Sequence, residues 1–219
     1  MPAGRRIPRP PDTPPSRPPP PDTSDADVPA DVAKAAGELT ALNARIRTCE
    51  ACGRAGAARV YGTGYPRAAV MVVKGSPSPE EASSAHAFEA EAPALTKAFE
   101  ALGIPVAWVY GSTAVRCGDA PPSAGELEAC SRHLLVEVES IQPRVLVAFG
   151  DAAVEAVRSL DGRCGLGVPD DIPRGQPVGL RGDLVMIATE ELPAGVTNRD
   201  AKRRLWRDLQ AVPKLIGLG

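Results

Sequence analysis

The chain has 219 residues, of which 43% are hydrophobic and 24% are charged, and its formal net charge is −2. These values are ordinary for a soluble globular protein and argue against a strongly basic nucleic-acid binder, so any DNA contact would depend on a local patch. No run approaches the roughly 20 apolar residues of a membrane span, and the N-terminus lacks the apolar core of a signal peptide. We therefore expect a monomeric, cytoplasmic protein with no membrane contact.

The N-terminal segment, residues 1–29, is rich in proline with short Asp, Ser and Thr insertions. Such a segment cannot bury enough apolar surface to fold, so we predict a disordered, partly polyproline II arm. One interpretation gives this arm a protein partner, and the other makes it a plain solvated tail. We predict that residues 30–219 form one folded domain.

A helix is the first element expected after the arm. From Asp31 to Ile46 the apolar residues recur at helical spacing and fall on one face. The helix leads directly into Cys49 and Cys52, and a glycine-rich loop follows.

Strands then alternate with helices to the end of the chain. Segments rich in apolar and β-branched residues predict buried strands at 69–73, 106–112, 144–149 and 184–188. Helices are predicted at 90–102, 125–141, 151–160 and 198–215. This alternation is typical of the α/β class and predicts a three-layer αβα sandwich around a central four-stranded, mostly parallel sheet. Ligands in such folds bind beyond the carboxyl ends of the strands.

Four cysteines form the most informative pattern. Cys49 and Cys52 make a CxxC at the end of the first helix, Cys117 follows the second strand, and Cys130 lies in the next helix. Four thiolates can bind zinc or an iron–sulfur cubane, whereas free cysteines are otherwise often small buried hydrophobes. Zinc ribbons usually contain two closely spaced CxxC pairs, so the wide separation of the last two cysteines favours a cluster over zinc. Cys164, in a glycine-rich loop, has no evident partner.

The order of these motifs resembles the family 4 uracil-DNA glycosylases. The segments TCEAC, VRC, GELEAC and PRVLVAFG carry the resemblance, which extends from Asp31 to Leu215. It implies that Cys49, Cys52, Cys117 and Cys130 bind a [4Fe-4S] cluster. It also implies a DNA partner and a role in base-excision repair, the hydrolysis of the N-glycosidic bond of a flipped, damaged base.

The resemblance places the family's motif loops on residues that differ from the motifs. The GE(A/G)PG loop after the first strand corresponds to residues 74–78, which keep Pro77 but have Gly75 in place of the acid. The His-Pro-Ser motif after the last strand corresponds to residues 191–194, where Glu191 stands and the histidine is missing. A carboxylate there would repel a departing base anion, and losing one stabilising donor typically costs roughly a hundredfold or more in rate.

Base recognition falls on two further positions by the same resemblance. Phe88 corresponds to the phenylalanine that stacks on the flipped uracil, with a core position as the other interpretation. Thr113 corresponds approximately to the asparagine that reads the uracil edge, and its single hydroxyl cannot replace the paired donor and acceptor of an amide.

Two functional hypotheses from the sequence rank ahead of a third, a zinc protein with an unrelated role. The chain is either an active glycosylase with altered chemistry or base preference, or a catalytically inactive glycosylase-fold iron–sulfur protein that binds nucleic acid or protein. Arg203 and Arg204 on the terminal helix either hold the DNA backbone or belong to a solvated helix face.

Overall fold

The structure is a computed structural model in which residues 28–54, 56–192 and 198–218 are described. Nearly all of the predicted arm, and Pro193 and Ala194 of the last motif, lie outside these residues. No helix among the described residues is long and apolar enough to cross a membrane.

A six-stranded sheet forms the centre of the domain, with the strand order β1-β3-β2-β4-β6-β5. The four predicted strands are its parallel core: β2 (Val70–Lys74), β3 (Val109–Thr113), β4 (Val145–Phe149) and β6 (Val185–Thr189). The predicted four-stranded sheet is therefore too small. Two short antiparallel strands, β1 (Thr63–Gly64) and β5 (Pro177–Gly179), extend its two edges. Neither is long enough to display a periodicity of two, which is why the sequence pattern does not reveal them.

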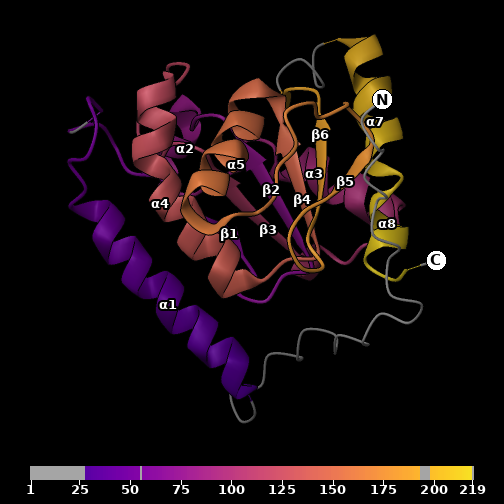
Figure 1. Ribbon diagram of the computed structural model, residues 1–219, viewed down its shortest axis with the longest axis horizontal. Helices are drawn as coiled ribbons and strands as arrows, with labels where there is room; N and C mark the ends of the chain where they lie inside the picture. Colours follow the sequence, from indigo (N-terminus) through magenta and orange to yellow (C-terminus); the bar gives the residue numbers. More distant parts are fainter. Residues whose placement is uncertain (1–27, 55, 193–197, 219) are drawn as a thin grey trace.

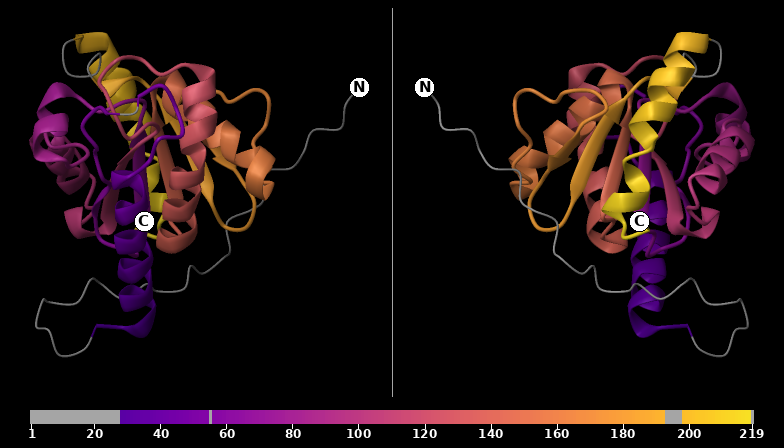
Figure 2. Two further views of the ribbon diagram at one scale, coloured as in Figure 1. Left: turned by 90° about the vertical axis from the view of Figure 1, so that its left-hand side faces the viewer. Right: turned by 90° about the vertical axis from the view of Figure 1, so that its right-hand side faces the viewer.

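Helices cover both faces of the sheet (Figures 1 and 2). One face carries α4 (Ala124–Ile141) and α5 (Gly150–Cys164), and α1 (Ala30–Arg47) packs against α4. The other face carries α2 (Pro79–Ser84), α3 (Ala92–Ala101), α7 (Arg199–Leu209) and α8 (Val212–Leu215). The chain therefore forms the expected three layers.

Three local predictions need correction. The terminal helix predicted at 198–215 is two helices, because Pro213 has no amide hydrogen to continue the α7 ladder and instead lies in the first turn of α8. Cys164 is the last residue of α5, with Gly165 in a left-handed C-cap, and so does not lie in the loop. The second strand begins only at Val109, because residues 106–108 form a 3₁₀ turn.

The two faces of the sheet belong to separate hydrophobic cores. Met71 and Val73 point into the core shared with α1, α4 and α5, while Val70 and Val72 point into the core shared with α3, α7 and α8. Because both faces are covered, the central strands are apolar on both sides. This alternation also decides the direction of the residues that follow at the carboxyl edge of the sheet.

Candidate functional site

Four cysteines from three separate segments line one cavity. Cys49 and Cys52 follow α1, Cys117 lies just beyond β3, and Cys130 is in the second turn of α4. The rest of the cavity wall is formed by Ile46, Ala51, Arg116, Ala129 and His133. The structure therefore brings the four predicted ligands to one cavity.

Local interactions explain why these segments meet. Helix α4 begins at a capping box in which Ser123 and Glu126 bond reciprocally to each other's backbone amides. Arg54, in the loop after the CxxC, donates from Nε to Glu126 Oε1 at 2.9 Å and from Nη1 to the Cys117 carbonyl at 3.0 Å. A single arginine therefore connects the CxxC loop, the segment after β3 and the start of α4.

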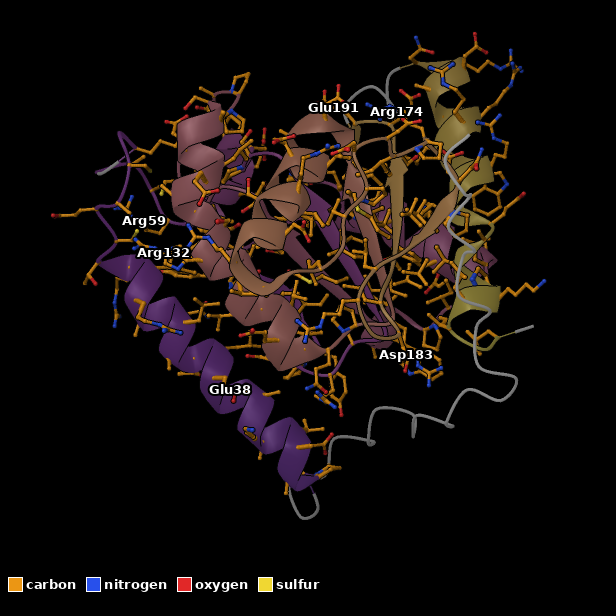
Figure 3. All side chains as sticks on the ribbon, in the orientation of Figure 1. Glu38, Arg59, Arg132, Arg174, Asp183 and Glu191 are labelled. Atoms are coloured by element: carbon orange, nitrogen blue, oxygen red, sulfur yellow. The ribbon has the colours of Figure 1, made fainter. Side chains whose placement is uncertain are left out.

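Two arginines and a histidine surround Cys49. Arg132 Nη2 lies 3.2 Å from Cys49 Sγ, and His133 Nε2 lies 3.4 Å from the same sulfur. Arg59 donates to the Cys49 carbonyl at 2.8 Å. Figure 3 shows Arg59 and Arg132 together at the end of α1.

Burial raises the pKa values of two of the thiols and lowers the pKa of a neighbouring histidine. Burial raises the pKa of Cys130 to about 11 against the opposing effect of Arg116, and it also raises the pKa of Cys117 against Arg59. Burial, reinforced by the nearby arginines, lowers the pKa of His133 to about 4. Both buried thiols therefore keep their protons at neutral pH, and a metal that bound here would have to displace them.

The donor set fits an anionic metal–thiolate group. Four sulfur donors face one cavity, and the wall beside them contains a buried arginine but no carboxylate. Among the described residues, however, no three His, Cys, Asp or Glu side chains are gathered closely enough to hold a single metal ion. The ligands of a cluster bind several metal atoms and need not converge on one point. For a cluster, the relevant observation is that the four cysteines line the same cavity.

A buried ion pair borders the cysteine cavity, because one of its members, Arg116, belongs to the cavity wall. Arg116, fully buried, donates from Nη2 to Glu137 Oε2, and Ser112 Oγ donates to the same oxygen at 2.6 Å. Tyr110 donates from its hydroxyl to Glu137 Oε1 at 3.2 Å. Gly62 closes over this group, since a Cβ there would lie 2.5 Å from Glu137 Oε1. The sequence indicates Glu137 only through its place on the apolar face of α4, seven residues after Cys130.

The second place to consider is the carboxyl edge of the sheet. Thr113, Lys74, Phe149 and Thr189 are paired in one row across β3, β2, β4 and β6. By the alternation of the strands, all four side chains point to the face that carries α3 and α7. The row therefore brings the predicted position Thr113 next to the loop that begins at Lys74.

Lys74 is largely buried and sits among acidic and aromatic groups. Its Nζ lies 2.8 Å from both Glu81 Oε2 and Glu91 Oε1, and 5.2 Å from the centre of the Phe88 ring. Phe88 is 5% exposed, has a positive φ of 65°, and packs at 6.2 Å from the ring of Phe149. Sequence reasoning missed both carboxylates. The Ser-x-x-Glu pattern at 78–81 could have identified one of them as a capping box.

The other predicted motif positions lie close to this row. Gly75 follows Lys74 directly, and its carbonyl accepts from the Val115 amide at 3.1 Å. Pro77 is buried in the same loop. Glu191 is exposed and lies against Gly150, where an added Cβ would approach Glu191 Cγ to 2.2 Å. Figure 3 shows Glu191 above the sheet, near Arg174.

The two arginines predicted for DNA contact are exposed on α7. Arg204 pairs with Glu190 at 2.7 Å, immediately after β6, and Arg203 pairs with Asp200 at 2.9 Å. The first pair holds α7 beside the carboxyl edge of the sheet. An acidic neighbour partly neutralises the charge of each arginine, so the two form a weaker cationic patch than the sequence suggests.

The chain is similar to a known protein family and to a relative of known name. The model of the uracil DNA glycosylase superfamily matches residues 61–210. The type-4 uracil-DNA glycosylase of Pyrobaculum aerophilum is 29% identical over 134 residues, which is 58% of this chain and 67% of that protein. The matched family region contains Cys117, Cys130 and the whole carboxyl edge of the sheet, whereas Cys49 and Cys52 precede it.

Proposed function

Because the chain belongs to the uracil-DNA glycosylase superfamily, we propose that it is a family 4-like DNA-repair glycosylase that carries a [4Fe-4S] cluster. DNA is its partner, and a flipped damaged base is its substrate. The base enters at the carboxyl edge of the sheet, near Phe88 and Thr113, while Arg203 and Arg204 contact the DNA backbone. Cys49, Cys52, Cys117 and Cys130 hold the cluster.

The convergence of four cysteines on one cavity carries the cluster part of this proposal. When bound, the cluster supplies cross-links between α1, the segment after β3 and α4, so that its role is structural. Zinc is the competing cofactor. Anaerobically purified protein should be brown, absorb broadly near about 400 nm, and contain iron and sulfide in equal amounts. Colourless protein with one zinc per chain would replace the cluster by zinc.

The proposed reaction hydrolyses the glycosidic bond with water, which also supplies the proton for the base. A water oxygen bonds to the sugar C1′, the glycosidic electron pair leaves with the base, and the base then takes up a proton. Thr113 offers one hydroxyl to the base, and this Oγ1 is buried and bonded to no other described residue. Lys74 supplies a positive charge beside the row, although two carboxylates share it. Glu191 opposes a leaving anion unless its carboxyl group is protonated or turned away.

The surroundings of Lys74 favour a second candidate, a glycosylase fold that binds without turnover. The ammonium group lies over the ring of Phe88, and Glu81 and Glu91 neutralise its charge. In this state Phe88 is covered, so a base would stack on it only after Lys74 moves. A protein of this kind binds DNA in a cluster-dependent way but releases no base.

One assay separates the two candidates. Cluster-loaded full-length protein is incubated with single-stranded and duplex oligonucleotides that contain uracil, hypoxanthine or xanthine, and abasic sites are then cleaved with alkali. Strand cleavage that depends on one of these bases supports the glycosylase. DNA binding by fluorescence anisotropy without any cleavage supports the binding module. Protein that neither binds nor cleaves any of these DNAs contradicts both candidates.

A further inference from the structure

Arg116 presents unused hydrogen-bond donors beside the four cysteines. Its side chain is 1% exposed and forms part of the cavity wall. Only Nη2 has a partner, the Glu137 carboxylate, while Nε and Nη1 are buried without a hydrogen bond to any described residue. A buried guanidinium donor without a hydrogen bond lowers the stability of the fold, so we expect Nε and Nη1 to have acceptors.

The cavity offers few candidates for those acceptors. Apart from the cysteines, its wall contains Ile46, Ala51, Ala129 and His133. None of these presents a carboxylate, and the cysteine sulfurs are the anionic atoms that metal binding would create there. The backbone of Arg116 already hydrogen-bonds with the Cys130 thiol, which places this residue beside that ligand.

A separate set of contacts fixes the orientation of the guanidinium group. Glu137 is fully buried and also accepts hydrogen bonds from Ser112 and Tyr110 on β3. The carboxylate therefore cannot follow Arg116 if the arginine moves, and it fixes the position of Nη2. This is the arrangement of an outer residue that orients a group toward a metal centre.

We infer that Arg116 is a positioning residue for the metal group, donating hydrogen bonds from Nε and Nη1 to its sulfur atoms and compensating its negative charge. This inference rests on the proposed cluster. A cation and two donors beside an anionic cluster stabilise its more reduced state, because reduction adds negative charge. Glu137 acts through Arg116 and sets its direction.

Three variants of the full-length protein test the inference. Arg116→Lys keeps the charge and the pairing with Glu137 but lacks the two free donors. Arg116→Met combined with Glu137→Met removes both charges, so that no isolated charge stays buried and the variant is expected to fold. Arg47→Met is the matched control, since Arg47 is an exposed arginine at the end of α1 outside the cavity wall.

The measurements are iron and sulfide per chain and the reduction potential of the cluster by protein-film voltammetry. We expect the potential to shift to more negative values in Arg116→Lys and further in the double variant, with no shift in Arg47→Met. A loss of cluster from both Arg116 variants, but not from the control, also supports the inference.

Two results overturn it in different ways. Unchanged potential and unchanged iron content in both Arg116 variants refute the role of Arg116 and leave the proposed cluster intact. Wild-type protein without iron and sulfide refutes the cluster and this inference together.

Discussion

Replacing Glu81 by glutamine removes a buried carboxylate that several donors share. Oε2 accepts from the Ser78 amide at 2.6 Å and from Lys74 Nζ at 2.8 Å, while Oε1 accepts from the Phe88 amide. A glutamine has a single carbonyl oxygen, so its NH₂ group must face one of these donors whichever way the amide is turned. The variant therefore leaves a donor unsatisfied and removes one of the two partners of Lys74.

The expected cost follows from these contacts. Removing one member of a buried ion pair costs about 3–5 kcal/mol, and the lower value applies because Glu91 still pairs with Lys74. In a chain of this size 1 kcal/mol corresponds to about 2–4 °C, so the melting temperature should fall by about 6–12 °C. Calorimetry or circular dichroism at a fixed scan rate measures this shift.

Glu80 provides the matched control. It is the preceding residue of the same helix and is exposed. Glu80→Gln should therefore change the melting temperature by no more than about 2 °C, the value expected of a surface substitution. If Glu81→Gln melts within the same interval as Glu80→Gln, the shared carboxylate does not hold this loop and the reasoning is wrong.

Three further changes test other parts of the structure. Thr113→Val removes a buried hydroxyl without a described partner, so thermal unfolding should show unchanged stability or a gain of up to about 1 kcal/mol; a clear loss would mean that the hydroxyl is bonded. Gly62→Ala places a Cβ 2.5 Å from Glu137 Oε1 and should cost about 1–3 kcal/mol in the same assay, whereas a neutral result would contradict the close packing there. The pKa of Glu126 is lowered to about 2, first by its bond to the Ser123 backbone and then by Arg54, so its carboxylate stabilises the fold above pH 4.5 and this contribution is lost as the pH falls toward about 2. The melting temperatures of wild type and Glu126→Gln should accordingly differ near about pH 7 and converge near about pH 2; an equal difference at both pH values would exclude this linkage.

Local sequence patterns predict the central part of the fold well. The runs of apolar residues identify all four parallel strands, because strands buried on both faces must be apolar throughout. The edge strands β1 and β5 escape detection, since two or three residues cannot show a pattern and are held by pairing with β3 and β6.

The candidate sites likewise contain some residues that the sequence reveals and others that it does not. The cysteines are recognisable because residue type and spacing carry the chemistry, and the structure brings Cys49 and Cys130 to one cavity. The partners of Lys74 are not recognisable, since Glu91 is seventeen residues away and only the folded loop brings the two together. Similarly, Glu137 is an ordinary helical glutamate by sequence, and its role depends on the fold of β3 around it.

The packing of α1 on α4 has a consequence for the order of events during synthesis. α1 (Ala30–Arg47) leaves the ribosome well before α4 (Ala124–Ile141), which completes both its hydrophobic contact and the set of four cysteines. At translation rates of about 5–20 residues per second, Cys49 and Cys52 are synthesised several seconds before Cys130. The nascent chain therefore passes through a period in which a CxxC on an unsupported helix is open to oxidation, and the proposed cluster could be inserted only in the last stage of folding.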